Sequence, residues 1–185
     1  MVKPSAGELL YGDVSLASKS TREILGLGIS YVSQQDKVFP NLTVEENILI
    51  SASLAQKNLR ALREQLERTL SLFPQLRPKL GSKAGSLSGG EQQLVAISRA
   101  ILSRPKLLLI DELSIGVATP ILEAIAEGLL LSPERDFTIL MAEQNVNWAL
   151  RVADEAYILR LGKVAAHVTD TGSVTQEELR QAFLT

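Results

Sequence analysis

Two patterns of apolar residues alternate along the chain. Short apolar runs occupy 29–32, 107–110 and 137–141, and the last two are typical of strands buried in a parallel sheet. Apolar residues at helical spacing follow Ser88 and Thr119, and both residues stand where a helix cap is expected. Strands that alternate with helices in this way predict an α/β fold with a mainly parallel sheet.

A helical stretch interrupts this alternation. Thr43 and Glu46 have the spacing of a capping box, which predicts a helix from Val44 to about Ala55. A second helix is predicted where apolar residues recur every three or four positions, at Leu59, Leu62, Leu66, Leu70 and Phe73. Prolines and glycines between 74 and 85 then break the chain, so the stretch forms a small helical subdomain.

These elements divide the chain into three parts. Residues 1–42 are β-rich, with a turn at Gly12-Asp13, and residues 43–86 form the helical subdomain. Residues 87–185 form the rest of the α/β core, which closes with a hairpin around Gly162 and a short helix capped at Thr175.

Composition narrows the class of protein. The 185 residues, 45% of them hydrophobic, suit one domain with a small inserted lobe. A net charge of −2 argues against non-specific nucleic-acid binding, and the lack of cysteine excludes disulfides. The sequence has neither an apolar run of the roughly 20 residues that span a bilayer nor a signal-peptide pattern, which predicts a cytoplasmic chain.

The sharpest chemical signal is the run Leu87-Ser88-Gly89-Gly90-Glu91-Gln92-Gln93. Two glycines at a helix start let the backbone approach a ligand closely, and the exposed N–H groups with the helix dipole suit a phosphate. A simpler interpretation is that Ser88 and Glu91 only form a capping box.

A second signal is the carboxylate pair Asp111-Glu112, which follows the apolar run at 107–110. Open α/β sheets bind their ligands at the carboxyl ends of strands. There, one carboxylate can hold Mg²⁺ and the next can orient and deprotonate a water molecule. The alternative is a strand that simply ends in polar residues.

In their order and spacing, these segments resemble the motifs of ABC-type ATPases. The run at 87–93 resembles the signature motif, and 107–112 resembles Walker B with its catalytic glutamate. Other segments resemble the Q-loop, the start of the helical subdomain, the D-loop and the switch region, at 31–34, 39–47, 114–117 and 143–145. The resemblance implies a P-loop NTPase fold of the ABC type with an inserted helical subdomain.

The resemblance also implies ATP and Mg²⁺ as ligands and gives roles to single residues. Asp111 and Gln34 would bind Mg²⁺, and Glu112 would polarise the attacking water. Gln144 would take the place of the family's switch histidine, although an amide cannot carry a proton as histidine does.

Two further segments would act at the contact with a second ATPase subunit. The signature residues would contact the γ-phosphate of ATP held by that subunit, namely Ser88, Gly89, Gly90 and Glu91. Ser114 and Gly116 would belong to the D-loop.

Details of the motifs resemble one branch of the family. Glu143-Gln144-Asn145 at the switch, together with Leu72-Phe73-Pro74, resembles importers of branched-chain amino acids, most closely their second ATPase subunit. Urea-type importers are close relatives. This resemblance implies transmembrane permease subunits as partners and a position on the inner face of the cell membrane.

The Walker A loop, Gly-x-x-x-x-Gly-Lys followed by Ser or Thr, has no match in the sequence. By the resemblance, Met1 falls just after the Walker A helix, so we expect an incomplete fold, truncated before or through this loop, with no ATPase activity on its own. The family places the Walker A strand inside the sheet, so we expect unpaired neighbours and poor solubility, strand exchange or a partner that fills the gap. Leu113 also replaces the family's usual proline.

Three functions remain open at this stage. The chain is an importer ATPase subunit, a non-catalytic chain that pairs with a complete subunit, or a lobe of a chromosome-maintenance or DNA-repair ATPase. The short helical subdomain disfavours the third, which requires a long coiled coil. We expect His167 and Trp148 to serve surface and packing roles.

Overall fold

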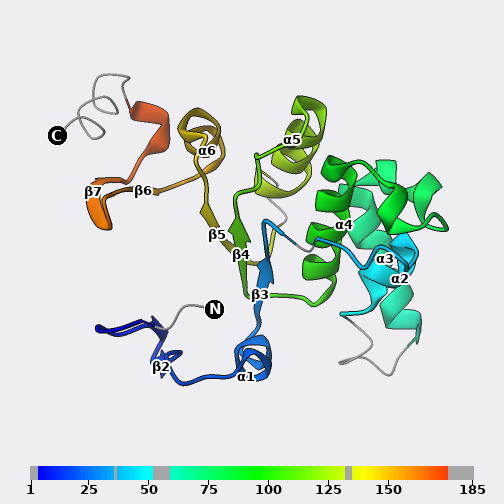
Figure 1. The fold of residues 1–185 in the computed structure, drawn as a ribbon, viewed down its shortest axis with the longest axis horizontal. Helices are drawn as coiled ribbons and strands as arrows, with labels where there is room; N and C mark the ends of the chain where they lie inside the picture. Colours follow the sequence, from blue (N-terminus) through cyan, green and yellow to red (C-terminus); the bar gives the residue numbers. More distant parts are fainter. Residues whose placement is uncertain (1–3, 36, 52–58, 132–134, 175–185) are drawn as a thin grey trace.

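A three-stranded parallel sheet lies at the centre of the molecule (Figure 1). The computed structural model describes residues 4–35, 37–51, 59–131 and 135–174. The sheet has the order β3-β4-β5, with bounds Ile29–Val32, Leu107–Asp111 and Thr138–Ala142. Both pairings are parallel, which confirms the predicted α/β fold and all three predicted strands.

Two antiparallel hairpins form separate sheets. The first pairs β1 (Leu10–Tyr11) with β2 (Val14–Ser15) around the predicted turn, where Gly12 has a φ of 56°. The second pairs β6 (Ala156–Arg160) with β7 (Lys163–Val168) around Gly162, as predicted.

The described part of the chain has six α-helices, of which α2 and α3 form the helical subdomain. Their bounds are α1 Thr21–Gly26, α2 Val44–Leu49, α3 Leu59–Leu72, α4 Gly89–Leu102, α5 Thr119–Ile125 and α6 Val146–Val152. Shorter turns are η1 Pro74–Lys79, η2 Ala84–Ser86, η3 Ala126–Leu130 and η4 Thr171–Ser173, of which η3 is a π-helical extension of α5. Within the described ranges, no helix is long and apolar enough to cross a membrane.

The predicted capping boxes start their helices as expected. Thr43 caps α2 and Ser88 caps α4, each with a glutamate three residues later that bonds back to the cap. The helix predicted to run from Val44 to about Ala55 is shorter than expected, because α2 ends at Leu49 and Ile50 is its C-cap. The helix predicted at Thr175 lies outside the described residues.

The predicted cap at Thr119 is wrong by one residue. Ala118 is the N-cap of α5, with no side-chain hydrogen bond, and its carbonyl accepts from the N–H groups of Ile121 and Leu122. Thr119 is therefore already helical and Pro120 occupies the second position, where its missing N–H costs no helical hydrogen bond.

One core joins the helical subdomain to the sheet. Phe73 and Leu70 from the subdomain, Ile97 from α4 and Leu108 from β4 are all fully buried in it. The helices α2 and α3 both contact α4, which also contacts β3. The central helix α4 therefore carries the signature segment at one end and fixes the subdomain against the sheet.

One face of the sheet is exposed, which contradicts the prediction that β5 is buried. Tyr31, Leu109 and Leu140 stand side by side on it, and Tyr31 and Leu140 are 56% and 62% exposed. In the described part of the chain no strand pairs with the outer edge of β5, and the β6-β7 hairpin forms its own sheet. Parallel strands are normally covered on both faces, so this open face departs from the usual arrangement.

Candidate functional site

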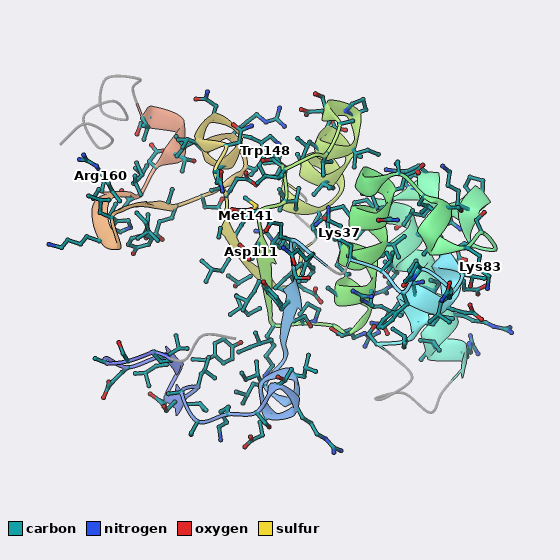
Figure 2. The ribbon with its side chains drawn as sticks, viewed as in Figure 1. Lys37, Lys83, Asp111, Met141, Trp148 and Arg160 are labelled. Atoms are coloured by element: carbon teal, nitrogen blue, oxygen red, sulfur yellow. The ribbon has the colours of Figure 1, made fainter. Side chains whose placement is uncertain are left out.

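The carboxyl ends of the three parallel strands bring the predicted catalytic residues together. Gln34 follows β3, Glu112 follows β4 and Gln144 follows β5. Figure 2 labels Asp111 at the end of β4, close to Met141 of the neighbouring strand. Because parallel strands end at one edge, residues far apart in the sequence meet here.

Glu112 lies between two amide groups. The Nε2 atom of Gln34 donates to one carboxylate oxygen and Nε2 of Gln144 donates to the other. The backbone of Glu112 has a φ of 48°, in the left-handed region that non-glycine residues rarely adopt, and its N–H donates to the Ala142 carbonyl at 2.9 Å. Both carboxylate oxygens of Glu112 are therefore oriented by side chains from neighbouring strands.

Asp111 has a partner that the sequence did not identify. The hydroxyl of Tyr31 donates to Oδ2 of Asp111 at 3.1 Å. Partial burial, followed by the bond to Asp111 and its charge, raises the pKa of Tyr31 above its usual value. The strand register explains this contact, because Tyr31 pairs with Leu109, which points to the same face as Asp111.

The predicted Mg²⁺ ligands offer the hard oxygen donors that this ion prefers. Asp111 contributes a carboxylate and Gln34 an amide oxygen, while the Gln34 amide nitrogen already donates to Glu112. Across the described residues there is no cluster of three or more acidic or histidine side chains that could hold a metal alone. Mg²⁺ usually keeps waters and substrate phosphates among its ligands.

The D-loop and the switch segment meet through Glu143, a residue whose role the sequence did not reveal. The backbone N–H of Ser114 donates to one oxygen of Glu143 at 3.0 Å, and the Ser114 hydroxyl donates to the other. Gln144 and Asn145 donate their backbone N–H groups to that same second oxygen, each at 3.0 Å. Gly116 has a φ of 68°, which its lack of a side chain permits.

The signature segment contains the capping box that the simpler interpretation predicted. Ser88 Oγ accepts from the Glu91 N–H at 3.4 Å, and Glu91 Oε2 accepts from the Ser88 N–H at 2.9 Å. Glu91 also bonds to Lys79, and this bond, followed by the one from the Ser88 backbone, lowers the pKa of Glu91. The predicted capping box is therefore confirmed.

The two signature glycines have different surroundings. A Cβ atom on Gly89 would meet nothing within 4 Å, whereas one on Gly90 would lie 3.2 Å from Ile121. Gly89 thus leaves the helix start open to an approaching group, and Gly90 permits close packing against α5. Among the described residues, no hydrogen bond connects this segment to Glu112.

The remaining candidates behave as packing and surface residues. Trp148 is 7% exposed within the core. His167 stacks on Tyr157 with ring centroids 4.1 Å apart and bonds to Glu155 on the hairpin surface.

Residues 1–114 match the ABC transporter family model. The chain is 37% identical to the high-affinity branched-chain amino acid transport ATP-binding protein BraG of Pseudomonas aeruginosa, over 97% of this chain and 76% of BraG. It is 38% identical to the probable branched-chain amino acid transport ATP-binding protein LivF of Archaeoglobus fulgidus, over 84% of this chain and 65% of LivF.

A solved structure shows the same fold. The ATP-binding cassette MJ0796, a dimer in a post-hydrolysis state bound to ADP and Pi, superposes with a TM-score of 0.75 at 26% identity. The alignment covers 90% of this chain and 74% of that one. Thus the chain spans roughly two thirds to three quarters of the length of each of these proteins.

Proposed function

The chain belongs to the ABC transporter family, and we propose that it is an ATP-binding subunit of an importer for branched-chain amino acids. The placement of Glu112 between Gln34 and Gln144 carries the catalytic part of this proposal. A carboxylate with both oxygens oriented by neutral amides is held in one position, where it can orient a water molecule for attack.

Each residue at the carboxyl edge then has a separate task. Bound Mg-ATP would supply the phosphate chain and the counter-charge that phosphoryl transfer requires. Asp111 and Gln34 offer oxygens to the metal, and Tyr31 fixes one oxygen of Asp111. Glu112 orients the water, and Gln144 keeps Glu112 in place while offering an uncharged amide to the phosphate.

These 185 residues contain no phosphate loop, so we propose that they do not turn over ATP on their own. The open approach at Gly89 supports a role at the nucleotide of a second ATPase subunit. The alternative function, a non-catalytic chain that pairs with a complete subunit, rests on the same two observations.

The relatives support a substrate and a location for the chain within this proposal. BraG and LivF are branched-chain amino acid transport proteins, which supports leucine, isoleucine and valine as cargo and a place beside permease subunits on the inner face of the membrane. Deletion of the gene is expected to abolish uptake of labelled leucine and to leave urea uptake unchanged. Loss of urea uptake alone would overturn the assignment.

Two glycine variants test whether the signature segment acts on the nucleotide of a second ATPase subunit. In a co-purified assembly with a complete ATPase subunit, Gly89→Ala is expected to lower ATP turnover about tenfold or more, because the added methyl blocks close approach to phosphate at a cost of at least ~1.4 kcal/mol. Gly26→Ala, which also meets nothing within 4 Å, is the control and should leave turnover unchanged. Equal turnover in both variants would contradict the trans role.

A further inference from the structure

Four hydrogen-bond donors converge on the half-buried carboxylate of Glu143. They are the N–H and hydroxyl groups of Ser114 and the N–H groups of Gln144 and Asn145. Hydrogen bonds to a carboxylate are about twice as strong as those between neutral groups. The side chain of Glu143 therefore joins the loop after β4 to the loop after β5.

The hydrogen bonds to Glu143 form part of a closed ring of contacts between the two loops at the carboxyl edge of the sheet. Ser114 lies two residues after Glu112, and Gln144 directly follows Glu143. The ring is completed where Gln144 donates through Nε2 to Glu112. Any movement of one loop would therefore stretch either the bonds to Glu143 or the bond between Gln144 and Glu112.

The ring is needed because the backbone around Glu112 is strained. The positive φ of Glu112 persists only where surrounding contacts enforce it. The next residue, Leu113, is fully buried but lacks the fixed φ that a proline would supply. The bonds from Ser114 to Glu143 provide a constraint on the other side of Leu113.

We propose that Glu143 is a positioning residue that holds Gln144 against Glu112. It acts through backbone groups and touches neither nucleotide nor metal in this role. The inference rests on the proposed function only in that Glu112 and Gln144 form the reacting edge, and its test uses no nucleotide. Failure of ATP turnover in the assembly would therefore leave the test intact.

The test is an NMR comparison of Glu143→Gln with the unaltered chain. Glutamine offers one acceptor oxygen and places an NH₂ group where the second oxygen was, so at least one of the four donors loses its acceptor. Amide exchange is expected to quicken about tenfold at the N–H groups that lose their acceptor, which are those of Gln144 and Asn145 on one oxygen or that of Ser114 on the other. The Gln144 side-chain NH₂ signal, identified by its loss in Gln144→Glu, should move to its free position.

The matched measurement is the NH₂ signal of Gln34, which bonds to the same carboxylate from β3. It should stay in place, and exchange in β4 and α4 should change less than about twofold. Glu127→Gln, on the exposed side of η3, should change nothing at this edge. The proposal is overturned if the Gln144 NH₂ signal stays, if the Gln34 signal moves with it, or if exchange quickens throughout the sheet.

Discussion

In each of the two candidate sites, one carboxylate lies at the centre of the hydrogen bonds. At the sheet edge Glu112 is oriented by Gln34 and Gln144, and at the start of α4 Glu91 closes the capping box and pairs with Lys79. The capping box of Glu91 was predicted from a local motif and is confirmed, and the catalytic role of Glu112 stays a prediction. The sequence missed Glu143, whose partner Ser114 is 29 positions away, because such contacts arise from the sheet register.

The charge of Glu91 predicts how the free energy of unfolding changes with pH. Its pKa is lowered in the folded chain, chiefly by Lys79, so its ionised form stabilises the fold above the unfolded pKa of about 4.3 and the benefit disappears as the pH falls through the folded value. Glu91→Ala is expected to lower the free energy of unfolding by about 1 kcal/mol near neutral pH, by loss of the cap and the ion pair.

Urea unfolding near pH 7 and near pH 3 measures this effect. Glu91→Gln is the control, because glutamine can still close the capping box but cannot pair with Lys79. Its deficit near pH 7 should shrink near pH 3, because the stabilisation from the ionised form is lost as the pH falls toward the lowered pKa of the folded chain. A deficit of equal size at both pH values would show that the charge contributes nothing.

At the scale of elements, continuous apolar runs and capping boxes were reliable guides. They located β3, β4 and α4 because each depends on residues close in sequence. The prediction that β5 is buried failed because Leu140 needs cover from other parts of the fold. Burial of a strand depends on its neighbours, which an apolar run alone does not reveal.

Leucines on the two faces of the sheet should respond differently. Leu108 of β4 is fully buried, so Leu108→Ala is expected to cost about 2–5 kcal/mol of unfolding free energy. Leu140 on the open face is 62% exposed, so Leu140→Lys should change stability by less than about 0.5 kcal/mol. Denaturant unfolding of the two variants provides the comparison.

The Leu140→Lys variant also tests whether the open face of the sheet drives self-association. Analytical ultracentrifugation of the unaltered chain should show concentration-dependent self-association, because an apolar face beside an unpaired strand edge promotes it. Leu140→Lys should reduce it. Association that is unchanged in this variant would assign it to another surface.

At the scale of the whole molecule, the signature and the carboxyl edge are two separate half-sites. The edge holds Gln34, Glu112 and Gln144, and the signature presents Gly89 at the start of α4, with no bond between them in the described chain. Neither half-site includes a phosphate-binding loop, because the 185-residue sequence contains no Walker A motif. The account therefore requires a second subunit for ATP to be held firmly.

Calorimetric titration of the purified chain with Mg-ATP tests this requirement most directly. A complete ATPase subunit, titrated under the same conditions, serves as the positive control. The account predicts no micromolar binding by the chain alone, since the backbone N–H groups and lysine of a phosphate loop are lacking. One-to-one binding at micromolar affinity by the pure chain would contradict it.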